Sequence, residues 1–386
     1  MRGIAVGLAG FCTFLNLYSP QALLPLLAAE FGVGAAAISA TMTSATLAVA
    51  MTAPFSGAAA DVIGRKYVIT AAMALLAAPT LMMAFAPDVE ALVAWRFVQG
   101  LMLPPIFVVM IAYIGDEWPA TEVAAMAGVY TSGASIGGFC GRFLTGVLTD
   151  LVGWRSAHLV LAAITLAAAL AMAAILPRER SFVRSESFRA SLRQMVAHLR
   201  NTQLLATYAV GFGTLFNFIA TFTYVNFVLA APPYNFSATL LGMIFFAYLI
   251  GAAITPMMGR AVGRFGRRPF MIGNLALWAC GIAMTLLPSL IAIIAGLAVC
   301  ATCGLISQAI STGYVTLSAH EGRSSAVGLY VTAFYVGGSF GALLPGLAWN
   351  TAGWTGCVAM VAAMLATMAA VVVLVWRDRA TASAAA

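Results

Sequence analysis

Charged side chains are scarce in this sequence: Asp, Glu, Lys and Arg make up 8% of its 386 residues, and hydrophobic residues make up 62%. A soluble domain carries roughly 25% charged residues, so this chain cannot cover a water-facing surface of usual composition. Most of its surface must therefore face lipid. The apolar residues form long runs rather than short alternating segments, which favours transmembrane helices over a membrane barrel.

Each long apolar run is a candidate transmembrane helix, because about 20 apolar residues cross the hydrocarbon core. The chain has length for about twelve such helices and no room for a soluble domain of usual size, about 100 residues. We expect an all-α polytopic membrane protein with spans at Ile4–Leu27, Ile38–Ala60, Tyr67–Phe85, Leu92–Ile114, Val123–Leu148, Ser156–Leu176, Leu204–Ala230, Ala238–Val262, Pro269–Leu287, Leu290–Leu317, Ser325–Ala348 and Thr355–Val375.

Residues that hold metals or act as nucleophiles are equally sparse. The six cysteines fall inside apolar runs, and the three histidines, His158, His198 and His320, are scattered over loops and span ends. We therefore expect no metal, no cofactor and no enzyme activity. A membrane sensor would need an extramembrane domain, for which there is no room. A glycine-rich loop before a Lys-Ser/Thr pair is also missing, so ATP is not the expected energy source.

The basic residues are distributed unequally between the two membrane sides. If the N-terminus lies in the cytoplasm, the inner loops contain Arg65, Lys66 and the arginine-rich stretches 178–200 and 260–268, whereas the outer loops contain Arg155 alone. This positive-inside bias predicts cytoplasmic termini and a multi-pass protein of a bacterial inner membrane. It also explains the net charge of +7 without a nucleic-acid partner.

The sequence contains an internal repeat at an offset near 200. Asn16 recurs as Asn217. Within 128–154, the residues that recur unchanged 200 positions later are Gly128, Tyr130, Gly137, Gly138, Gly141, Leu144, Gly146, Gly153 and Trp154. Two halves in the same orientation predict two pseudo-symmetric six-helix bundles related by an axis along the membrane normal. We place the first bundle at 1–176, a cytoplasmic linker at 177–202, the second bundle at 203–376 and a cytoplasmic tail at 377–386.

Several motifs resemble those of the major facilitator superfamily. The loop from Gly57 to Lys66 (GAAADVIGRK) resembles the family's signature loop between its second and third helices, and residues 259–268 form a degenerate copy. The stretch from Arg96 to Gly100 resembles the family's second motif. Residues 133–138 (GASIGG) resemble the glycine-rich motif of the twelve-helix drug:proton antiporter branch. Two positions depart from these patterns, Val62 in the loop and Ala134 in the antiporter motif.

The resemblance implies an alternating-access transporter with coupling and gating residues in these motifs. A carboxylate at Asp61 can face the positive N-terminal end of another helix, in this family the eleventh, near Ser324 and Ser325. We expect this contact to hold the outward-open state, although Arg65 and Lys66 can simply anchor topology. The residues that the motifs assign to coupling or gating are Asp61, Gly57, Gly64, Arg65, Arg96, Gly100, Gly137 and Gly138.

Two arginines, Arg96 and Arg142, lie inside predicted spans at similar depth, where charges are expensive. They are expected either to face a central cavity and bind an anionic substrate, or to extend toward outer headgroups. The other candidate substrate-binding residues are polar groups in otherwise apolar helices, which alternatively form interhelical hydrogen bonds. These candidates are Asn16, Gln21, Asn217, Tyr224 and Asn226.

No Asp or Glu occurs deep within any predicted span. Proton coupling would then depend on Asp61, Asp150, Glu30 or His158, or on a proton carried by the substrate. The leading prediction is a monomeric secondary transporter that exports a small molecule through the bilayer, driven by the proton gradient. The alternative is an organic-anion carrier or importer of the same fold, and a membrane sensor or enzyme is the remaining alternative of another class.

Overall fold

The computed structural model describes residues 2–179, 195–319 and 323–376, which form helices and connecting turns without any β-strand. The middle of the predicted linker, residues 180–194, and the predicted tail at 377–386 lie outside the described residues. The all-α prediction therefore agrees with the described part of the chain.

The helices in the first part of the chain coincide with the first six predicted spans. Proline explains two interruptions: α1 ends before Pro20, and the fourth span breaks before Pro104, because proline lacks the N–H that continues a helix. The elements are α1 (Arg2–Tyr18), η1 (Gln21–Leu23), α2 (Leu24–Phe31), α3 (Ala35–Ile63), α4 (Arg65–Met83), α5 (Val89–Met102), α6 (Pro104–Glu117), α7 (Ala120–Val152) and α8 (Trp154–Ile175).

The helices in the later part of the chain coincide with the remaining predicted spans. The last element consists of two helices that meet at Gly353, where φ is 58° and the backbone is not helical. This agrees with separate eleventh and twelfth predicted spans. The elements are α10 (Thr202–Ala230), α11 (Ala238–Ile244), α12 (Phe246–Ile254), η2 (Thr255–Met257), α13 (Met258–Phe265), α14 (Arg267–Met284), α15 (Leu290–Ser318) and α16 (Arg323–Val375).

Ten helical stretches among the described residues are long and apolar enough to cross a membrane. The stretch Ser325–Val375 within α16 counts as one of them although it covers two predicted spans, and α14 is not among the ten. The predicted number of twelve spans therefore stays a prediction.

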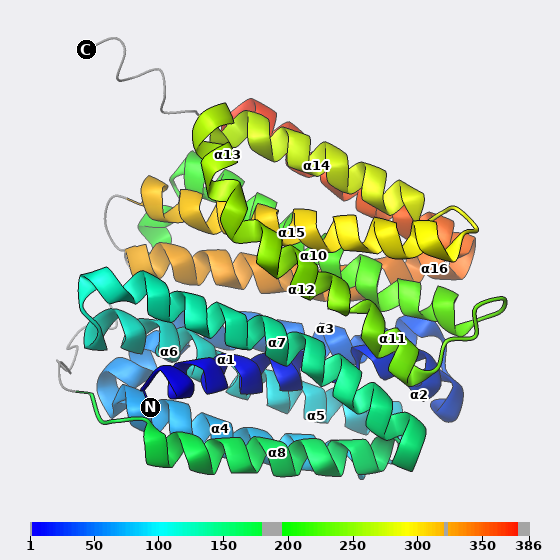
Figure 1. Ribbon diagram of the computed structural model, residues 1–386, viewed down its shortest axis with the longest axis horizontal. Helices are drawn as coiled ribbons and strands as arrows, with labels where there is room; N and C mark the ends of the chain where they lie inside the picture. Colours follow the sequence, from blue (N-terminus) through cyan, green and yellow to red (C-terminus); the bar gives the residue numbers. More distant parts are fainter. Residues whose placement is uncertain (1, 180–194, 320–322, 377–386) are drawn as a thin grey trace. The chain divides into compact units, whose positions relative to one another are not determined.

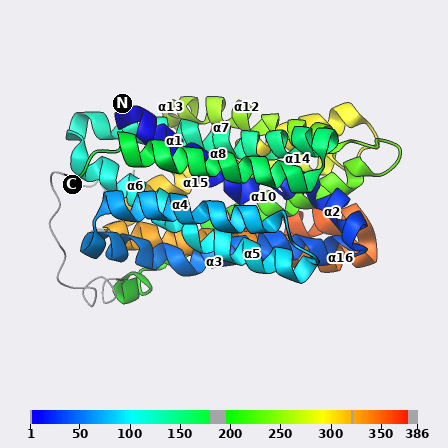
Figure 2. The ribbon, with the colours of Figure 1, turned by 90° about the horizontal axis from the view of Figure 1, so that it is seen from below.

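The described residues divide into two compact units. Unit 1 comprises described residues of Met1–Phe188 and Val225–Phe246, and unit 2 comprises those of Arg189–Tyr224 and Ala247–Ala386. Within unit 1, α7 lies along α1, and α4 lies beside α8 (Figures 1 and 2). Within unit 2, α14 lies beside α15 (Figure 1). The end of α10 and the whole of α11 belong to unit 1, and the predicted bundle boundaries stay predictions.

Glycines create close helix contacts in both units. A Cβ on Gly137 of α7 would overlap the carbonyl oxygen of Phe11 on α1, so only glycine permits this approach. In unit 2, a Cβ on Gly337 of α16 would overlap the carbonyl oxygen of Phe212 on α10 in the same way. Gly137 and Gly337, which the sequence repeat aligns, thus make equivalent contacts. Gly138 differs, because a Cβ there would meet its neighbours at ordinary distances.

Candidate functional site

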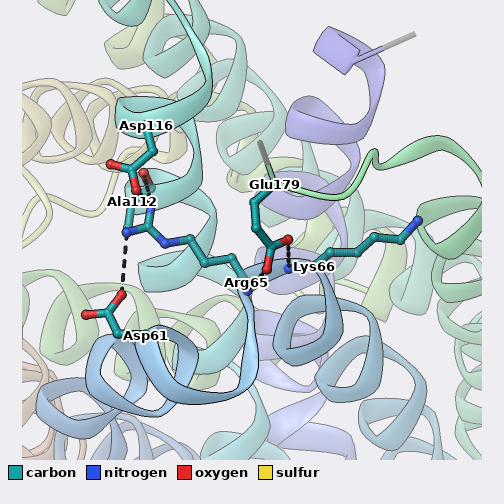
Figure 3. Close-up of polar contacts among 6 residues, drawn as sticks. All are labelled: Asp61, Arg65, Lys66, Ala112, Asp116 and Glu179. Atoms are coloured by element: carbon teal, nitrogen blue, oxygen red, sulfur yellow. Dashed lines mark hydrogen bonds and ion pairs between the residues drawn. The ribbon is translucent and has the colours of Figure 1, made fainter. Parts of the chain in front are cut away.

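The loop between α3 and α4 is fastened by a carboxylate from beyond α8 (Figure 3). Gly64 precedes α4 with a φ of 108° and has no side chain to cap the helix. Glu179 accepts hydrogen bonds instead from the backbone N–H groups of Arg65 (3.0 Å) and Lys66 (3.3 Å). A Cβ on Gly64 would lie 2.7 Å from Glu179 Oε1, so glycine leaves room for this external cap.

The side chain of Arg65 connects three helices in unit 1 (Figure 3). It forms ion pairs with Asp61 on α3 (3.5 Å) and with Asp116 on α6, and its Nη1 donates to Ala112 O (2.6 Å). Arg65 is largely buried, with 14% of its side chain exposed, and Asp61 is 39% exposed. The structure thus pairs Asp61 with Arg65 at the end of the α3–α4 hairpin. The expected contact of Asp61 with the eleventh span would join the two units and stays a prediction.

Gly57 and Gly100 differ in the space around them. Nothing lies within 4 Å of a Cβ built on Gly57, so the described residues give no close helix packing there. At Gly100, a Cβ would overlap the carbonyl oxygen of Ala45, so glycine brings α5 directly onto α3. The gating roles predicted for both residues stay predictions.

Arg96 is fully buried and holds the broken end of α1. In an unbroken helix, the carbonyl of Asn16 would accept from the backbone N–H of the residue at position 20, but Pro20 has none. Arg96 Nη1 donates to Asn16 O at 3.1 Å, and Nη2 donates to Leu17 O. Its Nε also donates to Thr41 O on α3 (3.2 Å). The guanidinium therefore satisfies backbone carbonyls inside unit 1.

The side chain of Asn16 completes a polar network with the neighbours of Arg96. Asn16 Nδ2 donates to Thr165 Oγ1 on α8 (3.0 Å), and Thr80 Oγ1 on α4 donates to Asn16 Oδ1 (2.9 Å). Gln99, which binds Arg96, donates to Thr80 Oγ1 (2.8 Å). These bonds are the interhelical type expected from the packing interpretation. Substrate binding by Asn16 stays a prediction.

Arg142 lies where α7 meets the end of α1, η1 and α11, all within unit 1. The guanidinium carbon lies 4.0 Å from the centre of the Tyr18 ring and 4.2 Å from the centre of the Phe245 ring. Its Nε donates to Gln21 Oε1 (2.8 Å), and its Nη1 donates to Gly138 O (2.8 Å). Asn226 Nδ2 donates to the carbonyl of Gln21 (2.8 Å). Three of the predicted binding residues, Gln21, Arg142 and Asn226, thus meet in one place.

The other two candidate binding residues lie in unit 2. Asn217 Nδ2 donates to Met368 Sδ (3.4 Å), and Tyr224 Oη donates to Ala342 O (2.7 Å). Both contacts connect α10 with α16. Their predicted contact with substrate stays a prediction.

The candidate proton-coupling groups away from the α3–α4 loop all have partners among the described residues. Asp150 accepts from the backbone N–H groups of Ala238 (3.3 Å) and Thr239 (2.8 Å), which fastens α7 to the start of α11. Glu30 accepts from Trp154 Nε1 and pairs with Arg155. His158 is buried, with Nδ1 2.8 Å from Trp154 O.

The sequence model of the Major Facilitator Superfamily matches residues 6–231 and residues 210–386. The chain belongs to the Major Facilitator Superfamily. It is 32% identical to the inner membrane transport protein YnfM of Escherichia coli over 94% of this chain and 87% of YnfM. It is 28% identical to the uncharacterized MFS-type transporter YybF of Bacillus subtilis over 92% and 89% of the two chains.

Two solved transporter structures share the fold. The nucleoside transporter NupG aligns with a TM-score of 0.76 at 14% identity, over 98% of this chain and 100% of NupG. The human organic anion transporter TETRAN aligns with a TM-score of 0.72 at 17% identity, over 96% and 98%. The superfamily makes this chain a multi-pass membrane transporter of small molecules rather than an enzyme.

The sequence interpretation of this superfamily member missed three residues that hold its candidate sites. Glu179 caps α4 and Asp116 pairs with Arg65, while Gln99 joins Arg96 to Thr80. Gln99 lies inside the RFVQG stretch, three residues after Arg96, which places both on one helix face. The sequence indicates Glu179 only weakly. Gly64, the residue before α4, has no side chain to cap the helix, so the cap must come from elsewhere, but residue spacing does not show which segment supplies it.

Proposed function

We propose that this superfamily member exports a small molecule across a bacterial inner membrane in exchange for protons. The observation that carries the proposal is the repeated glycine packing, of α7 on α1 and of α16 on α10, which supports two similarly built, rigid helix groups. Rigid groups related by an internal repeat suit transport by alternating access. The functional unit is a monomer with both termini in the cytoplasm and the proton gradient as energy source.

Export is supported by resemblance at the same helix. Gly133 and Gly137 of α7 belong to the stretch that resembles the antiporter motif, and a Cβ on either would overlap a backbone carbonyl of α1. The multidrug resistance protein Stp of Mycobacterium tuberculosis is 31% identical over 154 residues, which is 40% of this chain and 29% of Stp.

Asp61 and Arg65 form the proposed coupling element at the cytoplasmic end. Arg65 is bound to Asp61, Asp116 and Ala112 O, so protonation or repositioning of Asp61 changes what holds α3 against α6. Release of Asp61 from Arg65 would free its carboxylate for the N-terminal end of the eleventh span, where a negative charge is stabilised.

The experiment uses proteoliposomes that contain a pH-sensitive dye and the purified full chain. Addition of the hydrophobic cation ethidium should change the internal pH in wild type and much less in Asp61→Asn at equal reconstituted amounts. Glu90→Gln, an exposed acid on α5, is the matched control and should transport as wild type. Undiminished transport by Asp61→Asn would remove Asp61 from the mechanism.

A second candidate is an organic-anion carrier, which the buried Arg142 favours. A cationic side chain at that depth suits a negatively charged substrate better than a hydrophobic cation. Counterflow of a labelled anion without a pH change inside the same proteoliposomes would support this candidate over proton-coupled export.

A further inference from the structure

Four arginines gather at the loop between α13 and α14 in unit 2. They are Arg260, Arg264, Arg267 and Arg268. Arg268 donates to Val373 O, so this loop lies at the same end of unit 2 as the end of α16 (Figure 1). The predicted cytoplasmic tail follows α16, and the prediction therefore puts the loop at the cytoplasmic membrane surface. The other three arginines, which we call the arginine cluster, are exposed.

No carboxylate among the described residues balances the arginine cluster. The sequence contains no Asp or Glu between Glu186 and Glu321. None of the ion pairs between described residues involves the cluster, and the one side-chain interaction described for it is the guanidinium of Arg264 over the ring of Phe265, at 5.6 Å. Arg260 and Arg264 lie four residues apart on α13, so their like charges share one helix face and repel. The cluster is therefore suited to an anion from outside the chain.

The matching loop in unit 1 has the carboxylates that the arginine cluster lacks. The sequence repeat aligns Arg65 with Arg267. In unit 1, Arg65 pairs with Asp61 and with Asp116. In the copy, Gly263 occupies the position of Asp61, and α15, the counterpart of the fourth predicted span, contains no charged residue. The copy thus keeps the positive charge without either carboxylate, and an external anion can supply the counter-charge.

Apolar side chains beside the arginine cluster are also exposed. Met257 is 69% exposed and Phe265 is 62% exposed, and α13 has no buried residue. Apolar side chains at a membrane surface are stabilised when they enter the boundary between headgroups and acyl chains. A dissolved anion offers no such contact. Exposed arginines next to exposed apolar groups therefore suit an anionic lipid better than a dissolved phosphate.

We propose that the arginine cluster binds the phosphate of an anionic phospholipid in the membrane leaflet at this end of unit 2. Guanidinium groups donate paired N–H bonds to phosphate oxygens. A zwitterionic phospholipid has the same phosphate, but its own cation offsets the charge, so it should bind more weakly. The bound lipid supplies the counter-charge that Asp61 and Asp116 supply in unit 1. The proposal concerns a lipid partner and depends neither on the exported substrate nor on proton exchange.

The experiment measures lipid binding to the purified full chain in detergent by native mass spectrometry. Phosphatidylglycerol and phosphatidylcholine with the same acyl chains are the probes, and wild type should bind the first about tenfold more tightly. In Arg260→Gln/Arg267→Gln, the affinity for phosphatidylglycerol should fall about fivefold for each arginine removed. Arg178→Gln/Arg200→Gln is the matched control, because it removes two exposed arginines from other predicted cytoplasmic segments, and it should bind as wild type.

Gly263→Asp restores the carboxylate that the copy lacks. Gly263 precedes Arg267 by four residues, which is also the spacing of Asp61 and Arg65 in their ion pair. Nothing lies within 4 Å of a Cβ built on Gly263, so a side chain fits there. The new carboxylate should compete with the lipid phosphate and weaken phosphatidylglycerol binding about fivefold. Gly263→Asn adds similar bulk without charge and should bind as wild type, and equal thermal midpoints of the two variants would show that the fold is not the cause.

Four results would overturn the proposal. They are equal binding of the two lipids to wild type, equal affinities of the two double arginine variants, equal affinities of Gly263→Asp and Gly263→Asn, and displacement of phosphatidylglycerol by an equal concentration of inorganic phosphate. The last result would assign the cluster to a dissolved anion. Because lipid binding in detergent needs no transport, these results are separate from the export proposal. Normal lipid binding without proton movement in proteoliposomes would overturn proton coupling alone.

Discussion

Asn16 on α1 bonds to side chains from α4 and α8, whereas Asn217, at the matching position on α10, donates to the sulfur of Met368. Among the described residues, Asn217 Oδ1 has no hydrogen-bond partner. The helix backbones around the two residues pack alike, through Gly137 in one unit and Gly337 in the other. The repeat therefore preserves backbone contacts while the polar interior differs.

The backbone of the first helix in each half explains the difference. α1 stops at Tyr18 ahead of Pro20, which leaves the carbonyl of Asn16 without a backbone donor. α10 runs unbroken from Thr202 to Ala230, and Thr221 supplies the backbone N–H at the matching place. Arg96 donates to the carbonyls at the break in α1. α15, which coincides with the tenth predicted span and is the counterpart of the fourth, contains no charged residue. The half that has a proline at this position is thus also the half that has a buried arginine beside it.

The largest predicted loss of stability follows substitution of Arg96, which is present in only one of the two halves. Arg96→Met removes the donors to Leu17 O and Gln99 Oε1, while Asn16 O keeps Ser19 Oγ and Thr41 O keeps Ser44 Oγ as donors. Because each buried acceptor left without a donor costs about 1 to 3 kcal/mol, we expect a loss of about 2 kcal/mol or more. The thermal midpoint of the purified protein in detergent measures it.

Pro20→Ala in the Arg96→Met background tests the cause. The new backbone N–H at position 20 can reach Asn16 O and should restore part of the lost thermal stability. Pro20→Ala in wild type serves as the control. A double variant no more stable than Arg96→Met would show that Arg96 does not compensate for the proline.

The next largest effect compares the two glycine contacts. Gly137→Ala and Gly337→Ala each place a methyl group against a backbone carbonyl, which cannot move aside like a side chain. Overpacking of this kind costs about 1 to 3 kcal/mol, and we expect similar losses in both variants. Gly128→Ala and Gly328→Ala are the controls, because nothing lies within 4 Å of a Cβ there. If Gly137→Ala and Gly337→Ala lose clearly different amounts of stability, the two glycine contacts are not equivalent.

Sequence reasoning predicted the helices and the aligned glycines, but it did not predict that Gln21, Arg142 and Asn226 meet or how Arg96 is bonded. The helices and glycine contacts follow from apolar runs and from steric limits that the sequence carries directly. The sequence predicts a cavity or headgroup setting for Arg96, and it does not show that Arg96 donates to Asn16 O and Leu17 O at the break in α1 and to Thr41 O on α3. That pairing depends on how α1 and α5 pack, which spacing along either helix does not encode.

We expect a moderate loss of stability when Glu179, which caps α4 at the loop between α3 and α4, is substituted. Glu179→Ala leaves the N–H groups of Arg65 and Lys66 without their carboxylate cap. Loss of a helix cap costs about 0.5 to 2 kcal/mol, so the thermal midpoint should fall slightly. Glu179→Gln keeps one acceptor oxygen and should lie between the alanine variant and wild type. A midpoint for Glu179→Ala equal to that of wild type would exclude the cap as a stabilising contact.

The smallest expected effect is at Asn217, where the comparison with Asn16 is most direct. Asn217→Leu gives up a weak N–H···S contact and also removes a buried oxygen that has no partner among the described residues. Since these two changes oppose one another, stability should change by less than about 1 kcal/mol. Asn16→Leu, by contrast, removes the interhelical hydrogen bonds to Thr80 and Thr165 and should cost more in the same thermal assay. If Asn217→Leu proves neutral for stability yet abolishes transport, the residue contacts substrate, because packing alone could not separate the two measurements.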